Sequence, residues 1–510
     1  MSKDELIPFT SIKIASWVIA ICSIIIFGSV PIVQLVKERS SGEPLQEFDV
    51  FKQAPSVANL RLYENELEDN SVISQAIQPW YQLLSTRLAN QGNPEAVIGK
   101  DGWLFYRPSL DYIINPGSNF HRDLGPMPAM LSFHESLKAQ GVDLILLPVP
   151  GKATIYPEYL SGRYDTELGP PVNPYAPRFF QLLREKGVHV IDPANTLWEA
   201  KDNGPVYMLQ DTHWSPSGMK LAARLLAGAI QDGGWLTDAP QKSYRVQEVE
   251  VERLGDIHDM LNLPEDKTGG FKPMNIMIEK VVEAETDEPY LPDTNSPIVL
   301  LGDSFVNVFS KGHMGWGEYA GLAEHLALQL SAPVDVIAIN DGGPTTSRES
   351  LARRPNALVG KKLVIWQFAT RDLVNPESEW KIVNIPKPRI DPEAVETKHD
   401  SSSLVVFGEL TTVSMVPDPS QVAYSECVTY VKYRVISVEQ GEYEDVELLA
   451  VHWGMRDSKL MPAAQFQIGE KHRLSLDLFE DHEELSHIMQ ADDTDDYEHT
   501  PFWVLEMSPL

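Results

Sequence analysis

The sequence predicts an α/β domain with a mostly parallel sheet, preceded by a membrane helix and followed by a small all-β module. Three observations predict this arrangement. An uncharged apolar run lies near the N-terminus, short apolar runs alternate with helix-like stretches through the middle of the chain, and only strand-like runs follow a proline-rich segment. Alternation of strands and helices is typical of a parallel sheet covered by helices.

The apolar run at residues 14–36 contains no charged residue, and its 23 residues suffice for a bilayer span, which takes about 20 in a helix. A cleaved signal peptide is the alternative, but the run is long for one and no small-x-small cleavage site follows it. Two lysines before the run balance Lys37 and Arg39 after it, so the flanking charges do not decide the orientation. We expect residues 1–36 to be an uncleaved anchor.

Residues 37–90 are expected to be a linker and a helical lead-in, since apolar side chains recur every three or four positions near its end. Residues 91–383 hold the predicted α/β domain. Residues 384–403 are rich in proline and charge, which is typical of a linker. Residues 404–510 are expected to form a β-rich acidic module, either a sandwich or an OB-like barrel, that is separable from the chemistry.

The individual elements follow from runs of apolar residues and their spacing. The predicted strands are 142–149, 188–191, 297–301, 334–339 and 362–366 in the α/β domain and 404–407, 428–435, 446–451 and 502–505 in the module, and the predicted helices are 65–90, 175–186, 217–230 and 321–330.

The composition excludes several classes of function. The formal net charge of -31 argues against nucleic-acid binding, which requires a basic surface. From Asp400 onward there are 22 acidic and 6 basic residues, so capture of a polyanion by the module is unattractive. We expect the module to favour a neutral glycan or a basic protein. The two cysteines, Cys22 and Cys427, exclude a disulfide framework and a cysteine zinc site.

Ser304 stands in a Leu-Gly-Asp-Ser-Phe segment at the end of a predicted buried strand. The carboxyl ends of parallel strands are where ligands bind in α/β folds, and the glycine two residues earlier allows a sharp turn. Asp211 and His213 stand two residues apart, so in an extended loop their side chains project to the same side. Such a carboxylate can orient an imidazole that activates a serine, although a structural Asp-His pair is the alternative.

Two further interpretations concern ligands of this site. A zinc site of Asp211, His213 and His258 lacks ligand spacing, so we expect no metal. The backbone N–H of Ser304 is the first expected oxyanion donor. The side chain of Asn340 and the N–H of Gly343 could add to it, although an ordinary Asp-Gly turn also explains their segment.

Four segments carry a resemblance to a known family. They read Gly-Lys-Asp-Gly-Trp-Leu-Phe at 99–105, Pro-Val-Pro-Gly-Lys-Ala-Thr with Tyr-Pro-Glu at 148–158, Asp-Thr-His-Trp at 211–214 and Gly-Asp-Ser at 302–304. In order and spacing they resemble the alginate O-acetyltransferase AlgJ/AlgX family, over about residues 90–383. The resemblance implies a permuted SGNH-hydrolase-like three-layer α/β/α fold, in which the Asp-x-His element precedes the serine.

By this resemblance Ser304 is the nucleophile, His213 the general base and Asp211 its orienting group, with no cofactor. The resemblance implies acetyl transfer onto an exopolysaccharide outside the cytoplasmic membrane, with a multi-pass membrane acyltransferase delivering the acetyl group. Two alternatives stay open: an SGNH-type carbohydrate acetylesterase, in which water resolves the same intermediate, and a non-catalytic polysaccharide-binding scaffold of a synthase complex.

Several residues in the resembling segments have two interpretations. Trp103 and Phe105 fit a hydrophobic core or a platform for sugar. Lys152 could hold the carboxylate of an anionic sugar, or be an ordinary surface lysine. Arg371, which follows the strand 362–366, could line the same cleft.

Overall fold

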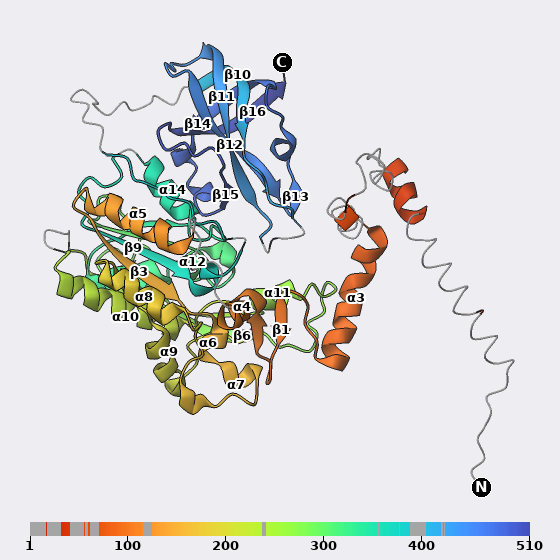
Figure 1. Cartoon of the computed structure of the whole chain (residues 1–510), viewed down its shortest axis with the longest axis vertical. Coiled ribbons are helices and arrows are strands. Elements are labelled where there is room, and N and C mark those ends of the chain that lie inside the picture. The colour runs from red at the N-terminus through yellow and green to blue at the C-terminus, as the bar shows by residue number, and fades with distance from the viewer. Residues whose placement is uncertain are drawn as a thin grey trace, which may run out of the picture. The chain divides into compact units, whose positions relative to one another are not determined.

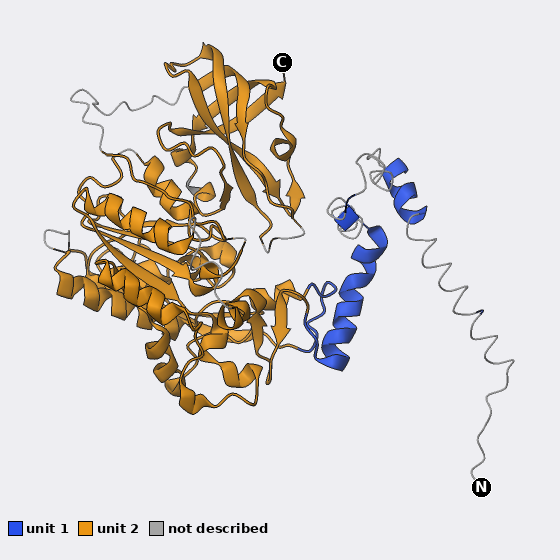
Figure 2. Cartoon of the chain, in the orientation of Figure 1, with its two compact units in different colours: residues 1–92, 262–270 blue, residues 93–261, 271–510 orange. Residues whose placement is uncertain are grey.

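The structure is a computed structural model that describes most of the chain from residue 71 onward. The described residues are 17, 32–40, 56, 60–61, 71–115, 125–236, 241–354, 356–376, 378–387, 404–419, 422 and 424–509. They belong to two compact units, residues 1–92 with 262–270 and residues 93–261 with 271–510, coloured separately in Figure 2.

Helix α3, Val72–Ala89, is the main described element of the first unit. The side chain of Ser71 caps its first turn by accepting the N–H of Ser74, and Asn90 ends it in the left-handed conformation. The helix lies inside the stretch that the sequence predicted to be helical.

The predicted membrane anchor, residues 14–36, lies outside the described residues except for residues 17 and 32–36. Among the residues that are described, no helix combines the length and the apolar character that crossing a membrane requires. The anchor therefore stays a prediction.

A parallel sheet forms the centre of the second unit. Within the described residues it has five strands in the order β4-β3-β9-β7-β8, and each neighbouring pair is parallel. Since all strands point the same way, their carboxyl ends meet at one edge. The strands are β3 (Asp143–Val149), β4 (His189–Val190), β7 (Ile298–Gly302), β8 (Asp335–Ala338) and β9 (Leu363–Ala369).

Helices cover both faces of this sheet, so the domain has the three layers that were predicted (Figure 1). One hydrophobic core contains side chains of α6 (Lys152–Ile155), α9 (Ala194–Ala200), α10 (Pro216–Gly233), α12 (Ser304–Asn307) and α13 (Leu322–Leu330). The other contains side chains of α5 (Pro126–Lys138), α8 (Ala176–Glu185) and α14 (Thr346–Arg353).

Two antiparallel hairpins were not predicted from the sequence. The strands β1 (Ala96–Ile98) and β2 (Leu104–Tyr106) form a short one, followed by α4 (Arg107–Ile114). The strands β5 (Tyr244–Arg253) and β6 (Met274–Glu283) pair over ten residues each. Alternate exposed and part-buried positions along β5 give it the period of two that a half-buried strand shows. The remaining short helices are α7 (Pro157–Leu160) and α11 (Asp256–Met260).

The C-terminal module is a small barrel, one of the two forms expected. In its described residues, β12 pairs with β16, β16 with β14, β14 with β10, β10 with β11 and β11 with β12, which closes a ring. The strands are β10 (Leu404–Val413), β11 (Cys427–Gln440), β12 (Glu447–Arg456), β13 (Lys459–Leu460), β14 (Lys471–Leu478), β15 (Met489–Ala491) and β16 (Pro501–Pro509).

Contacts join this module to the α/β domain. The buried side chains of Arg353 and Asp492 form an ion pair, and Lys381 Nζ donates to the carbonyl of Asp492 at 2.6 Å. The backbone N–H of Asn340 donates to the carbonyl of His487 at 3.1 Å. Removing the module would leave the Arg353 charge without its carboxylate, so truncation should cost stability. That the module is separable from the chemistry stays a prediction.

The predicted linker, residues 384–403, is described only up to residue 387. Its first residues pack on the α/β domain: Ile385 is buried, and its N–H donates to Ser136 Oγ of α5 at 2.9 Å. The domain therefore continues slightly beyond the predicted boundary at residue 383.

Candidate active site

Ser304 is the first residue of α12, directly beyond the carboxyl end of β7. The turn needs Gly302, because a Cβ there would lie 2.3 Å from Val306 Cγ2 and 2.7 Å from Gln367 Oε1. The Asp303 carboxylate accepts the N–H of Phe305 at 2.8 Å and so caps the short helix. The local sequence thus presents the Ser304 hydroxyl at the edge of the sheet.

The structure brings Asp211, His213 and Ser304 into one line of hydrogen bonds. His213 Nε2 lies 2.8 Å from Ser304 Oγ, and His213 Nδ1 lies 2.7 Å from Asp211 Oδ1. All three side chains are buried. A neutral imidazole with its proton on Nδ1 donates to the carboxylate and accepts the serine proton at Nε2.

The loop that carries Asp211 and His213 is fixed against the nucleophile helix. Trp214 Nε1 donates to the carbonyl of Phe305 at 3.1 Å, so the residue after His213 is bonded to the residue after Ser304. Ser215 caps α10 by accepting the N–H of Gly218 at 3.3 Å.

Asp211 accepts four hydrogen bonds. Oδ1 accepts Nδ1 and the backbone N–H of His213, and Oδ2 accepts Trp316 Nε1 at 2.7 Å and the backbone N–H of Asp256 at 3.0 Å. Burial acts to raise the pKa of Asp211, but the bonds and charge of His213 outweigh it and hold the pKa well below its usual range. A lowered pKa keeps Asp211 ionised beside His213 at neutral pH.

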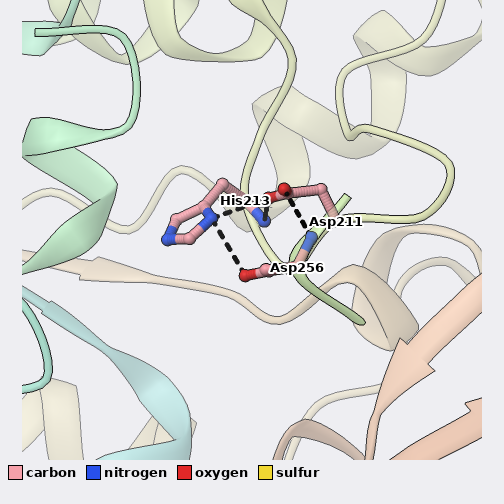
Figure 3. A group of neighbouring side chains, drawn as sticks. All are labelled: Asp211, His213 and Asp256. Carbon is pink, nitrogen blue, oxygen red and sulfur yellow. Dashed lines mark hydrogen bonds and ion pairs between the residues drawn. The ribbon is translucent and has the colours of Figure 1, made fainter. Parts of the chain in front are cut away.

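Asp256, which was not predicted from the sequence, is a second carboxylate at this imidazole (Figure 3). Its Oδ2 lies 3.5 Å from His213 Nδ1. Burial and the Asp211 charge raise the pKa of Asp256 to about 6, against the opposing charge of His213. Burial acts to lower the pKa of His213, yet its bond to Asp211 and the charges of both carboxylates raise it overall.

Asp256 and Trp316 stand beside glycines, and this is the signal that the sequence offers for them. Asp256 follows Gly255, where a Cβ would lie 2.3 Å from the carbonyl oxygen of Gln210, so the glycine permits the close approach of two loops. Trp316 stands between two glycines with positive φ, Gly315 and Gly317. Neither pattern is specific enough to predict a contact with Asp211.

Asp211, His213 and Asp256 also satisfy the spacing of metal ligands. Each carboxylate oxygen of Asp211 already accepts two N–H groups, and one of these is the Nδ1–H of His213. A metal ion would have to displace these bonds, so the donor set suits an orienting carboxylate better than a metal. His258, the third residue of the zinc hypothesis, packs its ring against Phe271 at 5.8 Å.

Lys152 does not lie in a cleft, which corrects the hypothesis that it holds a sugar carboxylate. Its side chain is buried, and Nζ donates to the carbonyls of Leu104 at 2.7 Å and Leu209 at 3.1 Å. Burial lowers the pKa of Lys152 to about 7 against the charges of Asp211 and Asp256. The Lys152 amine therefore joins strand β2 to the segment just before Asp211. Trp103 and Phe105 are likewise buried and belong to the core rather than to a sugar platform.

The amide of Asn340 is already engaged. Its Nδ2 lies 2.9 Å from His313 Nε2, and its Oδ1 accepts Asn307 Nδ2 at 2.9 Å. These bonds disfavour the predicted oxyanion role for the side chain of Asn340. Gly343 has a φ of 54°, in the left-handed region that favours glycine.

Arg371 follows β9 in the 3₁₀ turn Thr370–Leu373, at the same edge of the sheet as Ser304. Its guanidinium carbon lies 5.3 Å from the centre of the Tyr106 ring and 5.8 Å from that of Phe305. Its charge opposes protonation of His213 and so lowers the pKa of that imidazole. The residue is therefore close to the three hydrogen-bonded side chains.

Residues 96–370 match the family model described as "SGNH hydrolase-like domain, acetyltransferase AlgX". Among curated proteins, the chain is 29% identical over 302 residues to a Pseudomonas fluorescens protein named "Probable alginate O-acetylase AlgJ". The aligned region covers 58% of this chain and 72% of that protein. It is 32% identical over 182 residues to the protein of that name from Pseudomonas aeruginosa, covering 35% of this chain and 44% of the relative.

Among solved structures, the O-acetyltransferase domain of Pseudomonas putida AlgJ aligns with a TM-score of 0.43 at 22% identity, over 56% of this chain and 93% of that domain. The family match covers the α/β domain from β1 to the turn after β9 and leaves the C-terminal barrel outside it.

Proposed function

The chain belongs to the AlgJ/AlgX family of SGNH hydrolase-like acetyltransferases, and from this premise we propose that it transfers acetyl groups to hydroxyls of an exopolysaccharide through an acetyl-serine intermediate. The observation that carries the proposal is the unbroken line of hydrogen bonds from Asp211 through His213 to Ser304, with heavy-atom distances of 2.7 and 2.8 Å.

In the first half-reaction, Ser304 Oγ attacks the acetyl carbonyl while its proton passes to His213 Nε2. The ionised Asp211 stabilises the resulting imidazolium. The tetrahedral intermediate then collapses, the bond to the leaving oxygen breaks, and that oxygen takes the proton from His213. The acetyl group is left as an ester on Ser304.

In the second half-reaction, a sugar hydroxyl gives its proton to His213 Nε2 and attacks the acetyl-serine carbonyl. Collapse of this second intermediate breaks the bond to Ser304 Oγ, which recovers the proton. Both intermediates carry an oxyanion, for which we propose the N–H groups of Ser304 and Gly343 as donors; one such donor contributes about 2.7–4 kcal/mol. The scheme requires no cofactor.

We place this reaction outside the cytoplasmic membrane, with residues 1–36 as the anchor. The relatives are named alginate O-acetylases, which supports an alginate-like acceptor. The donor in this proposal is an acetyl group delivered by a multi-pass membrane acyltransferase.

The proposal is tested with the full chain in detergent micelles. The chain is incubated with p-nitrophenyl acetate, and the mass of the peptide containing Ser304 is followed with and without oligosaccharides. We expect an acetyl ester on Ser304, absent in Ser304→Ala, that passes to the oligosaccharide. The matched control is Ser132→Ala, which removes a hydroxyl of α5 that donates to Asn384 Oδ1.

Two outcomes would replace the proposal. Release of free acetate with no acetylated sugar, for every acceptor class tried, would favour the acetylesterase. Absence of any acetyl ester on Ser304 would favour the non-catalytic polysaccharide-binding scaffold.

A further inference from the structure

Helix α3 exposes the apolar side of an amphipathic pattern. Five large apolar side chains follow one another along it at spacings of three and four residues, so they lie on one side of the helix. Their exposed fractions run from 53% to 83%. A contiguous apolar surface of this kind marks an interaction site. The five residues, which we call the apolar stripe, are Ile77, Trp80, Tyr81, Leu84 and Leu88.

The buried side of α3 is a different one. Its buried residues are Gln82, Leu83 and Thr86. Gln82 Nε2 donates to Thr86 Oγ1 and to the carbonyl of Gln91, each at 3.1 Å. A helix that used its apolar side for packing would bury the stripe and expose such polar residues. Because α3 does the reverse, packing within the protein does not account for the stripe.

The composition of α3 fits the boundary between hydrocarbon and headgroups in a bilayer. Its 18 residues contain no acidic side chain, and Arg87 is their one charged residue. The whole chain, by contrast, has 73 acidic residues and a formal net charge of -31. Anionic lipids repel acidic segments, and α3 is free of that charge. Trp80 and Tyr81, in the middle of the stripe, are the residue types that are enriched at this boundary.

A contact within the first unit joins the start of α3 to the end of the predicted anchor. Residues 32–40 are helical, and Gln34 Oε1 accepts the backbone N–H of Val72 at 3.2 Å. Val72 is the first residue of α3, and residue 34 lies just before the end of the predicted span, residues 14–36. With that span in the bilayer, this bond holds the first turn of α3 at the membrane surface.

We propose that α3 lies flat on a phospholipid bilayer with its apolar stripe inserted among the headgroups. This inference goes beyond the proposed membrane anchor and rests on it. Insertion removes the five exposed side chains from water, which is favourable in proportion to the apolar area buried. The helix then gives the chain a second attachment to the membrane, between the span and the α/β domain, and the lipid is the partner that covers the stripe.

The test uses the full chain, reconstituted in phosphatidylcholine vesicles and carrying one nitroxide label. In a chain with Cys22→Ala and Cys427→Ala, the label is placed by Leu84→Cys in the stripe or by Gln75→Cys. Gln75 is the matched control, because it is also exposed and lies nine residues away, on the opposite side of the helix. Electron paramagnetic resonance measures collisions of the label with oxygen, which dissolves in lipid, and with a water-soluble nickel chelate.

We expect the ratio of oxygen to nickel collisions to be about tenfold higher at residue 84 than at residue 75, because the stripe lies in the acyl boundary. Equal ratios at the two positions would show that the stripe faces water and would overturn the inference. Low access to both reagents at residue 84 would overturn it too, because protein would then cover the stripe. Broadening by a second label would identify that protein as another copy of the chain. Elution of both labelled chains with the unlabelled chain in detergent checks that they fold.

Flotation of the vesicles after an alkaline wash separates this inference from the proposed anchor. If the chain floats with the vesicles but the label at residue 84 meets the nickel chelate freely, only the role of α3 is wrong. If the chain does not float, the anchor itself fails, and the inference fails with it.

Discussion

The α/β domain and the C-terminal barrel each bury histidines in a hydrogen-bonded network, but only the network in the α/β domain contains carboxylates bonded to the imidazole. At the edge of the sheet, Asp211 and Asp256 flank His213 and raise its pKa despite burial. In the barrel, Tyr433 Oη lies 3.0 Å from His472 Nδ1 and 3.4 Å from His452 Nε2.

Among the described residues, the carboxylate paired with these two histidines is that of Glu470, whose Oε2 lies 3.6 Å from His472 Nε2, further than Asp211 lies from His213. Burial lowers the pKa of His452 to about 3, with a further contribution from the neighbouring His472. Burial also lowers the pKa of His472, although Glu470 opposes it. Burial alone thus lowers the pKa of a histidine, so the imidazole has little tendency to take up a proton. A carboxylate bonded to the imidazole raises that pKa and allows the histidine to act as a general base. Four substitutions test this difference, from the largest expected effect on activity to the smallest.

Asp211→Asn should abolish most activity, because an amide can present its NH₂ to Nδ1 and stabilise the wrong tautomer of His213. We expect the rate of Ser304 acetylation to fall about 10³–10⁴-fold, the size of this effect in serine hydrolases. Burst kinetics with p-nitrophenyl acetate measure the rate. Asp287→Asn, an exposed carboxylate paired with Arg245, should match wild type. A loss below tenfold in Asp211→Asn would show that Asp256 can replace it.

Trp316→Phe should lower the acetylation rate about tenfold or more, since the indole N–H donates to the Asp211 carboxylate at 2.7 Å and a charged hydrogen bond is worth about 1.5–3 kcal/mol. The matched control is Trp235→Phe, which removes an indole bond of the same length, to Asp143 Oδ2, away from the site. Equal losses in the two variants would mean that the effect is on stability and not on the orientation of Asp211.

Asp256→Asn should move the pH–rate profile. The base is neutral His213, so activity is lost as pH falls through the pKa of that imidazole. The negative charge of Asp256 helps to raise this pKa, and its removal should therefore shift the acidic limb to lower pH. Asp259→Asn, an exposed neighbour paired with Arg253, should leave the limb in place. A shift toward higher pH would contradict the electrostatic account of Asp256.

His452→Phe should leave acetyl transfer within about twofold of wild type while changing stability in acid. The neutral form of His452 is favoured in the folded state, because its folded pKa of about 3 lies below the ordinary value of a histidine near 6.5. This contribution to stability is present above about pH 6.5 and is lost as pH falls toward 3. Urea unfolding at several pH values should show that His452→Phe lacks this loss; a large fall in activity at neutral pH would mean that the barrel network affects catalysis.

Much of the fold could be predicted because buried parallel strands are short, continuous apolar runs. The predictions 142–149, 297–301 and 362–366 correspond to β3, β7 and β9. The hairpin of β5 and β6 was missed, since its part-buried strands carry many charged residues and their pairing is separated by α11. The closure of the barrel depends on pairing β12 with both β11 and β16, which no local pattern indicates.

What the sequence by itself determined is chemistry that is local along the chain. In the Gly-Asp-Ser turn at 302–304 and the Asp-x-His segment at 211–213, neighbouring residues determine the backbone conformation and the direction of the side chains. These short motifs were sufficient to nominate Ser304, His213 and Asp211.

Only the tertiary structure decided how each remaining charge is satisfied. Lys152 and Arg371 look equivalent in the sequence as cations near predicted strands. In the structure, backbone carbonyls 48 and 57 residues away accept from Lys152, whereas Nη1 of Arg371 has no hydrogen-bond partner among the described residues. Asp256 and Trp316 reach Asp211 from 45 and 105 residues away. The electrostatic state of a buried group depends on every charge and dipole around it in space, and sequence separation carries almost no information about those distances.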